Sequence, residues 1–471
     1  MGLFDIVDDI TRTVSDVGAS VPWVSDPTIR LGVTGLSRAG KTVFITSLVA
    51  NLLNRNRMPQ LKAAASGAIQ TAYLQPQPDD TIARFDYENH LAALTAGQPS
   101  WPNSTRTVSE LRLSLKVQAS GLMGAFSGPR TVHLDIVDYP GEWLLDLGLL
   151  SKSFAEWSAD SLARASSRLQ ATAYLKICDG LDSSKRLNEP EAQVLAETYT
   201  AYLKEIKEDG YSDCTPGRFL LPGDLEGSPV LTFSPLALSD SNPRGSLYRE
   251  FERRFEVYKT KVVKPFFREH FARLDRQVVL VDALGAIHAG PQAVEDLRRT
   301  MADILDAFRP GQNAFLRQIF LGKRVEKILF AATKADHLHH SQHAQLTAIM
   351  EALLRDAKDR ADFAGAKTMA IAMASLRATT EETLTHEGQA LDVVRGRLLR
   401  DGKTAAFHPG ELPVDPARLL VPARQGAQAW LDEDYGAMSF APSKMELRPG
   451  EGPPHIRLDK AAEFLIGDRL R

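Results

Sequence analysis

Short apolar runs alternate with longer amphipathic stretches along the chain, and this alternation predicts an α/β fold. Most of the apolar runs are nearly continuous, as in strands of a parallel sheet that is buried on both faces. The amphipathic stretches repeat their apolar residues at helical spacing. We therefore expect a parallel-rich sheet flanked by helices. The predicted strands are residues 30–34, 109–117, 131–138, 277–282, 327–332 and 369–374.

Three of the predicted helices fall between the strands at 131–138 and 277–282, and they predict a large, mostly helical insertion. The last of these helices alternates aromatic and basic residues. This pattern favours a packing helix with a solvated basic side over a nucleic-acid surface. The predicted helices are residues 43–53, 154–176, 189–207, 246–274, 293–308 and 460–469.

Two further regions complete the expected organisation. Residues 54–104 are rich in Pro, Gln and Ala and predict a long irregular region, whereas Asp401 and Gly402 predict a hairpin turn near the C-terminus. The expected domains are an amphipathic N-terminal segment (1–27), the first part of a core (28–144), a mostly helical insertion (145–275), the second part of the core (276–380) and a hairpin and helix extension (381–471).

The N-terminal segment has an amphipathic helical pattern over residues 3–17. Its polar side carries several aspartates against Arg12, a sign of charge that does not suit an anionic lipid surface. Packing on the protein's own body or on a protein partner is therefore favoured. Nowhere does an apolar run approach the ~18 residues that span a membrane.

Composition agrees with an ordinary globular protein. The 471 residues are 44% hydrophobic and 24% charged, and a net charge of -3 gives no global attraction to nucleic acid. Two cysteines alone, Cys178 and Cys214, argue against a disulfide framework. We expect a cytoplasmic protein, with peripheral contact at the inner membrane left open as an alternative.

Residues 35–42 read G-L-S-R-A-G-K-T, a complete phosphate-binding loop between a predicted strand and a predicted helix. The glycines allow a tight turn in which backbone N–H groups face the β-phosphate of a nucleotide. Lys41 can reach the β- and γ-phosphates, and the hydroxyl of Thr42 can ligate Mg²⁺. The residues expected to bind nucleotide here are Gly35, Ser37, Arg38, Ala39, Gly40, Lys41, Thr42 and Val43.

A T-K-x-D motif at residues 333–336 follows a predicted buried strand and favours guanine as the base. The Asp336 carboxylate can accept hydrogen bonds from N1–H and from the exocyclic amine of guanine, a pattern that adenine does not offer. The stem of Lys334 can lie along the purine face, and a backbone N–H near Ser375 can face O6. The residues expected at the base are Thr333, Lys334, Asp336, His337, Ser375 and Leu376.

The strand predicted at 131–138 ends in D-x-x-G, an arrangement that senses a γ-phosphate. Asp138 can hold Mg²⁺ through water, and the N–H of Gly141 can donate to the γ-phosphate and order the segment that follows. Thr105 could close over Mg²⁺ and the γ-phosphate, with Thr107 as its rival. The expected metal ligands are Thr42, Thr105 and Asp138.

The stretches at 33–42, 101–102, 105–106, 135–146, 329–337, 454–459 and 464–471 carry a family resemblance. Their order resembles that of P-loop GTPases of the translation-factor-like class, and more specifically the YcjX family of bacterial stress-associated GTPases. The resemblance implies a P-loop GTPase fold with a large helical insertion, GTP and GDP binding, and Mg²⁺. It also favours Thr105 over Thr107, with Arg106 as a neighbouring nucleotide contact. It supplies neither a cellular task nor an identified protein partner.

Many GTPases place Gln directly after the D-x-x-G glycine to orient the attacking water, but this chain has Glu142. Glu142 could orient water as an acceptor, act as a base if its pKa is raised, or pair with a cation such as Arg106. Arg38 and Arg106 are candidates for an arginine finger in cis. We expect slow hydrolysis, on the order of 10⁻⁴ to 10⁻² per second. The expected catalytic residues are Lys41, Thr105, Gly141 and Glu142.

Four histidines, His337, His339, His340 and His343, lie close together in the sequence. They lack a cysteine or carboxylate at metal-ligand spacing, so a solvated helix start is favoured over a metal site.

These features favour a GTP-hydrolysing molecular switch whose helical insertion reports the nucleotide state to a protein partner. One alternative is an ATP-driven enzyme or chaperone-like ATPase, in which the T-K-x-D string is coincidental. Another is a nucleotide-stabilised binding module with negligible turnover. Asp336 discriminates between the first two, because its replacement abolishes guanine preference only in a guanine site.

Overall fold

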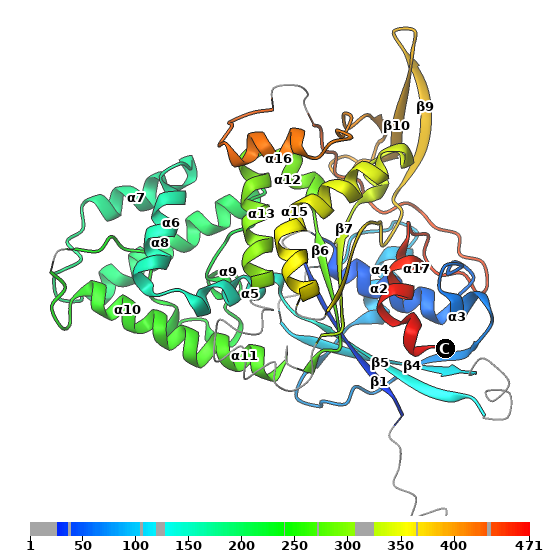
Figure 1. Ribbon diagram of the computed structural model, residues 1–471, viewed down its shortest axis with the longest axis horizontal. Coiled ribbons are helices and arrows are strands. Elements are labelled where there is room, and N and C mark those ends of the chain that lie inside the picture. The colour runs from blue at the N-terminus through cyan, green and yellow to red at the C-terminus, as the bar shows by residue number, and fades with distance from the viewer. Residues whose placement is uncertain are drawn as a thin grey trace, which may run out of the picture.

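The computed structural model describes residues 26–35, 39–103, 107–118, 128–239, 241–270, 273–306, 325–363, 366–430 and 435–471. The main sheet has the strand order β2-β4-β5-β1-β6-β7-β8, with β3 paired to β4, and a second sheet has the order β11-β10-β9 (Figure 1). The strands are β1 (Thr28–Gly35), β2 (Ile69–Gln75), β3 (Ala83–Arg84), β4 (Ser109–Val117), β5 (Arg130–Asp138), β6 (Arg276–Val281), β7 (Lys327–Ala332), β8 (Lys367–Ala372), β9 (Thr379–His386), β10 (Gln389–Arg397) and β11 (Thr404–Phe407).

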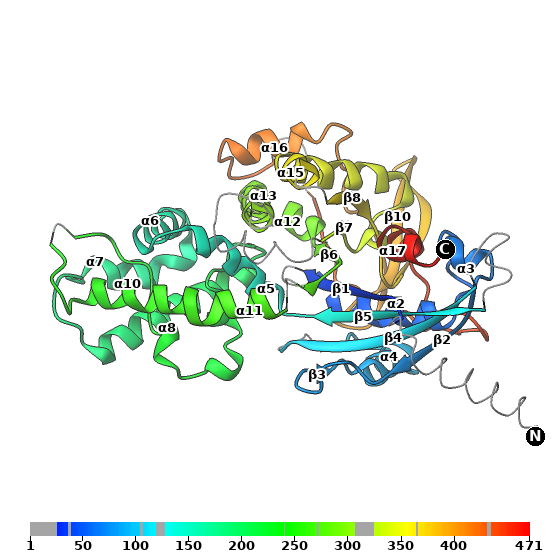
Figure 2. The ribbon, with the colours of Figure 1, turned by 60° about the horizontal axis from the view of Figure 1, so that its bottom comes forward.

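The centre of the main sheet is parallel, whereas one edge is antiparallel. β1 pairs in parallel with β5 and β6, and β7 pairs in parallel with β6 and β8. β4 pairs antiparallel with both β5 and β2. Helices flank this mixed, mostly parallel sheet (Figure 2). The predicted fold class, an α/β fold of the P-loop GTPase type, is confirmed.

Alternate side chains of the central strands enter two different cores, which explains their continuous apolar runs. On β6, Val279 and Val281 belong to one core, and Val278 and Leu280 belong to the other. The first core includes α12, α13 and α15, and the second includes α2 and α17. Burial on both faces therefore fixes β6 and its neighbours as the rigid platform of the fold.

The α-helices of the described residues cover both faces of the sheet and the region between β5 and β6. They are α2 (Lys41–Leu53), α3 (Lys62–Ala65), α4 (Tyr87–Thr95), α5 (Gly141–Leu145), α6 (Phe154–Ala165), α7 (Thr172–Asp179), α8 (Glu189–Glu208), α9 (Gly217–Leu220), α10 (Leu247–Tyr258), α11 (Lys264–Glu269), α12 (Ala283–Ala289), α13 (Pro291–Asp306), α15 (His343–Phe363), α16 (Ala417–Arg424) and α17 (Leu458–Ile466).

The described chain between β5 and β6 contains helices and loops without a strand. Here α6, α7, α8, α9 and α10 form a helical body beside the sheet (Figures 1 and 2). Its interior is aromatic: the ring of Trp157 stacks on Phe255 at 5.0 Å, and Phe251 is fully buried. The aromatic residues of α10 therefore serve packing, as predicted. The boundaries of the expected insertion domain, 145–275, stay a prediction.

Residues 54–104 are not irregular, contrary to the sequence prediction. They include α3, β2, β3 and α4, and β2 is the antiparallel edge strand of the main sheet. Because most side chains of an edge strand stay partly accessible, β2 lacks the continuous apolar run that marks the central strands. The pattern used for the other strands therefore could not detect it.

The helix predicted at 154–176 is also wrong, because α6 ends at Ala165 and α7 begins at Thr172. The helix predicted at 246–274 is present over a shorter range, with a π-helical turn at Lys259–Val263 between α10 and α11. The remaining predicted helices and strands are confirmed to within a few residues.

The C-terminal extension contains the expected hairpin and helix. Asp401 and Gly402 lie in the turn between β10 and β11, and Gly402 has φ of +71°. The predicted helix at 460–469 corresponds to α17 and the 3₁₀ turn that follows it. The guanidinium of Arg276, fully buried on β6, donates to the carbonyl of Leu465 at 2.9 Å and ties α17 to the sheet.

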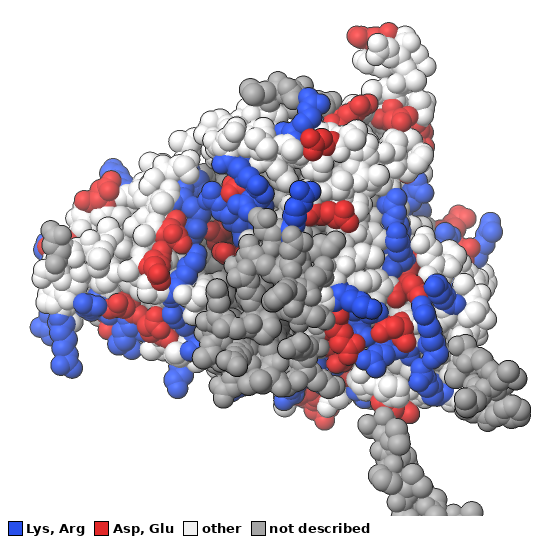
Figure 3. All heavy atoms as spheres, in the orientation of Figure 1, with Lys and Arg blue, Asp and Glu red and all other residues white. Residues whose placement is uncertain are grey.

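No helix among the described residues has the length and apolar character needed to cross a membrane. On the face shown in Figure 3, acidic and basic side chains are interspersed, which agrees with the small net charge. Cys178 and Cys214 are both free thiols. Residues 3–17 of the expected amphipathic segment lie outside the described residues.

A buried ion pair joins the break between α6 and α7 to α13. Arg168 Nη2 lies 2.8 Å from Asp296 Oδ1, and the two side chains are only 6% and 4% exposed. The other carboxylate oxygen of Asp296 accepts hydrogen bonds from the backbone N–H groups of Ser212 and Asp213, at 2.6 and 2.8 Å. This network couples the helical body to the helices on the sheet.

Replacement of Asp296 by Asn should lower the free energy of unfolding by about 3 kcal/mol, because Arg168 would keep a buried charge without its partner. Urea unfolding followed by circular dichroism measures the change. As a control, Glu252→Gln breaks an exposed pair with Arg249 on α10 and should cost less than about 1 kcal/mol. Equal costs for the two variants would contradict the assignment.

A second buried carboxylate follows α5. Asp146 accepts hydrogen bonds from the N–H of Gly217 at 2.8 Å and from the hydroxyl of Tyr258 at 2.5 Å. Burial outweighs these hydrogen bonds and raises the pKa of Asp146 to about 7. The folded protein therefore retains a proton between about pH 4 and pH 7 that the unfolded chain has lost, so stability falls as the pH rises through this window.

The variant Asp146→Asn resembles the protonated carboxyl at every pH. Its free energy of unfolding should match that of the wild type at pH 4 and exceed it by up to about 4 kcal/mol at pH 8, because the wild type then carries a buried charge. Urea unfolding of both proteins across this pH range measures the difference in the free energy of unfolding. The contributions of the other titrating groups are common to both proteins and cancel in this difference. A difference that stays constant with pH would refute the raised pKa.

Candidate functional site

The phosphate loop joins β1 to α2, and its described residues, Gly35 and 39–42, have features that suit an anion site. Gly40 is the N-cap residue of α2 and has φ of +78°, in the left-handed region that favours glycine. Gly35 packs closely, since a Cβ there would lie 3.0 Å from the Cβ of Leu280. Thr42 is buried in the first turn of α2, where the helix dipole favours negative charge.

A cavity of about 420 Å³ lies beside the phosphate loop, where β7 and β8 end. Its size falls in the range of about 300–1,000 Å³ that is usual for small-molecule sites. Its walls come from segments far apart in the sequence. The lining residues are Ala39, Gly40, Lys41, Thr42, Val43, Trp101, Pro102, Thr333, Lys334, Asp336, His337, Ala374, Ser375, Leu376, Leu399, Ser439 and Phe440.

The structure therefore brings together the phosphate loop, the T-K-x-D motif and the short segment at Ser375 and Leu376. Asp336 is 4% exposed, and its Oδ2 accepts a hydrogen bond from the N–H of Ala378 at 2.9 Å. Its backbone carbonyl accepts a hydrogen bond from the hydroxyl of Thr379. These bonds fix the orientation of the carboxylate at the cavity wall.

Lys334 has a partner that the sequence analysis missed. The backbone of Lys334 has φ of +60°. Its ammonium group pairs with the carboxylate of Asp282, which directly follows β6. Asp282 also accepts a hydrogen bond from the N–H of Gly285 and so caps α12. The ion pair holds the stem of Lys334 along the cavity wall. In the sequence, this ion pair is indicated only by an acidic residue, Asp282, at the end of a buried strand.

The outer wall of the cavity comes from the C-terminal extension. Phe440 lines the cavity, and its carbonyl accepts a hydrogen bond from Nε1 of Trp101 at 2.8 Å. Leu399, in the turn after β10, is 55% exposed and lines the same cavity. Trp101 was noted in the sequence, whereas nothing in the pattern of the extension indicated that it reaches the site.

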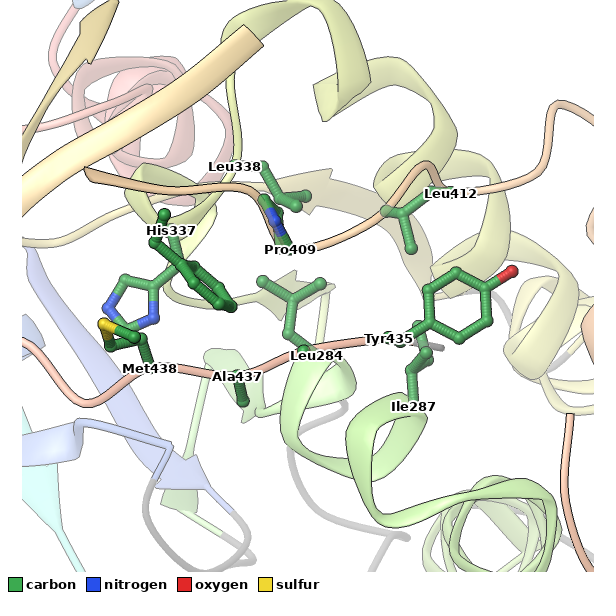
Figure 4. A pocket seen from close by; sticks show the side chains of 11 residues that line it. Leu284, Ile287, His337, Leu338, Pro409, Leu412, Tyr435, Ala437 and Met438 are labelled. Atoms are coloured by element: carbon green, nitrogen blue, oxygen red, sulfur yellow. The ribbon is translucent and has the colours of Figure 1, made fainter. Parts of the chain in front are cut away.

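His337 lines this cavity and also a second, apolar one, which Figure 4 shows. Its ring packs edge-on against Phe440 at 5.2 Å, and burial lowers its pKa, so the imidazole is neutral. The second cavity measures about 20 Å³, enough for roughly one water molecule. Leu284, Leu338 and Met438 are among its apolar lining residues. It is a packing gap and not a ligand site.

The D-x-x-G segment lies directly against the phosphate loop. A Cβ on Gly141 would lie 1.7 Å from the carbonyl oxygen of Gly35, so only glycine permits this approach. On its other side, a Cβ on Gly217 of α9 would lie 1.9 Å from the carbonyl oxygen of Glu142. The start of α5 is therefore held between the phosphate loop and the helical body by backbone contacts.

Glu142 pairs with the helical body. Its Oε1 lies 2.6 Å from Nζ of Lys207 on α8, and its side chain is 10% exposed. Burial alone would raise the pKa of Glu142, but the charges of Lys41 and Lys207 together hold this pKa below its usual value. Glu142 is therefore ionised, which removes the expectation of a base with a raised pKa. Its partner is Lys207, which the sequence gave no signal to identify.

Two of the expected metal ligands lie on described segments. Asp138 ends β5 and is fully buried, and it pairs in register with Val33 of the adjacent strand β1. Thr42 is buried at the start of α2, directly after the loop that follows β1. A buried carboxylate at the end of β5 and a buried hydroxyl at the start of α2 suit the oxygen preference of Mg²⁺. These two residues therefore fit the ion.

Four expected site residues, Ser37, Arg38, Thr105 and Arg106, lie outside the described residues. Thr107, the rival of Thr105, is described and exposed. The pairing of Glu142 with Arg106, one of the alternatives expected from the sequence, therefore also involves a residue outside the described ones.

Comparison with known proteins agrees with this architecture. A model of the YcjX-like family, DUF463, matches residues 29–470. A protein of Escherichia coli (strain K12) named Ras-like GTPase YcjX is 38% identical over 478 residues, covering 98% of this chain and 100% of the relative. A protein of the same name from Shewanella oneidensis is 36% identical over 497 residues, covering 100% of both. The chain thus belongs to the YcjX-like family.

Proposed function

We propose that this protein is a Mg²⁺-dependent GTP-binding switch that hydrolyses GTP slowly to GDP and phosphate. The observation that carries the proposal is the orientation of Asp336: its carboxylate lines the same cavity as Lys41 and Thr42 of the phosphate loop. The two related proteins named Ras-like GTPase support the guanine assignment. A coincidental T-K-x-D string would have no reason to share a cavity with the phosphate loop.

The base would lie between the stem of Lys334 and the segment at Ser375 and Leu376. Leu376 is 4% exposed and contributes an apolar surface, and the fixed carboxylate of Asp336 accepts from the donor edge of guanine. Adenine lacks this pair of donors, so the buried carboxylate would keep the hydrogen bond from Ala378 and gain none from the base. Desolvation of a carboxylate that lacks these partners disfavours adenine strongly.

The phosphates would lie along the loop before α2. Backbone N–H groups there and the ammonium group of Lys41 would hold the β- and γ-phosphates, and Thr42 with Asp138 would hold Mg²⁺. When bound, Mg²⁺ neutralises charge on the phosphate oxygens. Lys41 Nζ lies 3.5 Å from the carbonyl of Gly35, so it stays at the mouth of the loop.

Switching would start at Gly141. The backbone of Gly141 touches that of Gly35, so the segment has no free space beside it. A γ-phosphate that accepts a hydrogen bond from the Gly141 N–H would therefore displace neighbouring residues when it moves this segment. The movement would pass to the helical body through two contacts of the next residue, the backbone contact of Glu142 with Gly217 and its ion pair with Lys207. The helical body would then report the nucleotide state to a protein partner, in a stress response as the family resemblance suggests.

Hydrolysis would use Glu142 as an ionised acceptor that orients the attacking water, with Lys207 as its positioning residue. A carboxylate beside developing negative charge is less suitable than the glutamine of many GTPases, so slow turnover is expected. Lys207 offsets part of this unfavourable charge. An ATP-driven enzyme and a binding module without turnover remain the alternatives that the following experiments separate.

Calorimetric titration should give micromolar or tighter binding of GDP with Mg²⁺ and no binding of ADP. Asp336→Ala should weaken GDP binding by about 100-fold or more, since two charge-assisted hydrogen bonds are lost. Asp336→Asn is a matched variant whose amide oxygen can still accept from Ala378, while its NH₂ can donate to O2 of xanthine. It should bind xanthosine diphosphate better than GDP. Equal affinity for GDP and ADP in the wild type would support the ATPase alternative instead.

Lys207→Met should slow single-turnover GTP hydrolysis by about 10- to 100-fold with little change in GDP affinity, because Glu142 loses the contact that orients it. In Glu142→Gln, a neutral amide orients water without help from a lysine, so Lys207→Met should have little further effect in that background. Phosphate release after mixing with GTP and Mg²⁺ measures each rate. Equal effects of Lys207→Met in both backgrounds would refute the positioning role.

A further inference from the structure

Three metal-ligating side chains meet at the surface near the T-K-x-D motif. His339 and His340 precede α15, and Glu381 lies on β9. Nδ1 of His340 lies 2.6 Å from Oε2 of Glu381, and Nε2 of His339 lies 3.8 Å from the same oxygen. The ligand atoms all lie within 4.8 Å of one another. In the sequence these histidines have no carboxylate at metal-ligand spacing, and the fold supplies one from β9.

Neighbouring groups orient two of these ligands toward one point. Nδ1 of His339 lies 2.8 Å from the hydroxyl oxygen of Ser341 and 3.1 Å from Oδ2 of Asp392 on β10, which leaves Nε2 of that ring to face Glu381. Nη2 of Arg377 lies 3.4 Å from Oε1 of Glu381, on the side away from the histidines. A carboxylate behind an imidazole is the usual support of a metal-bound histidine.

We propose that His339, His340 and Glu381 form a zinc(II) site whose fourth ligand is water. Two imidazole nitrogens and a carboxylate oxygen are a known zinc ligand set, and nitrogen donors disfavour Mg²⁺ and Ca²⁺. His339 is 12% exposed and His340 is 69% exposed, so one ligand is fixed by packing and the other is open to solvent. The ion can therefore enter and leave without unfolding.

The position of the site gives it a consequence for the nucleotide cavity, and this part rests on the proposed function. β9 begins at Thr379, whose hydroxyl bonds to the backbone of Asp336, and Ala378 bonds to its carboxylate. A zinc ion would join the segment after Asp336 to β9 and restrain both groups that orient the carboxylate. GDP dissociation is expected to be about fivefold slower with zinc bound, at the low end of common coupling strengths.

The test is titration of the tag-free full chain with Zn²⁺ against a chromophoric chelator, with and without GDP. One equivalent should bind with a dissociation constant of about 1 μM or tighter. His340→Ala and Glu381→Ala should each weaken binding by about 100-fold, and Co²⁺ should give the visible absorption of a tetrahedral site. His386→Ala is the matched control, because His386 is an exposed histidine on the same strand and should leave binding unchanged.

Asp392→Asn separates a built site from fortuitous capture by two adjacent histidines. It removes no ligand, yet it should weaken Zn²⁺ binding by about 10-fold, because the carboxylate behind Nδ1 of His339 loses its charge and only the hydroxyl of Ser341 stays as a support. Absence of micromolar binding, or binding that His340→Ala and Asp392→Asn leave unchanged, would overturn the site whatever the nucleotide results. Zinc binding as described with an unchanged rate of GDP release would uphold the site and overturn only its coupling to the cavity.

Discussion

The rest of the structure depends on two contacts of backbone with backbone at the end of β5. Gly141 lies against the carbonyl of Gly35, and Gly217 lies against the carbonyl of Glu142, each at a separation that excludes a Cβ. The phosphate loop, the D-x-x-G segment and the helical body are therefore stacked without intervening side chains. Because close-packed groups cannot yield by small amounts, a shift at one layer must be taken up by the next.

Charged side chains also connect the phosphate loop, the D-x-x-G segment and the helical body. Glu142 stands between Lys41 of the phosphate loop and Lys207 of α8, and both cations hold its pKa down. Occupation of the loop by phosphate would engage Lys41 and alter this balance, which leaves Lys207 as the remaining partner of the carboxylate. Charge as well as packing thus connects the phosphate loop to the helical body, and Asp146 adds a titratable contact between α5 and α10.

The C-terminal extension contributes lining residues to the nucleotide cavity. Phe440 forms a cavity wall, and its carbonyl accepts the indole hydrogen bond of Trp101. Thr379 and Ala378 donate hydrogen bonds to Asp336. Glu381, on β9, meets His339 and His340. The bond between Trp101 and Phe440 joins residues 339 positions apart in the chain. The small sheet of β9, β10 and β11 therefore acts on the orientation of the groups that would bind the base.

The sequence by itself determined the elements whose signal is local. Buried strands such as β6 and β7 show continuous apolar runs, and the phosphate loop and the T-K-x-D motif place their residues at fixed spacing after such strands. Only the tertiary structure decided the edge strand β2, the pairing of Glu142 with Lys207, and the meeting of His339 and His340 with Glu381. The physical reason is that an exposed edge has no continuous apolar pattern, and that a contact between distant segments leaves no periodic trace in either one.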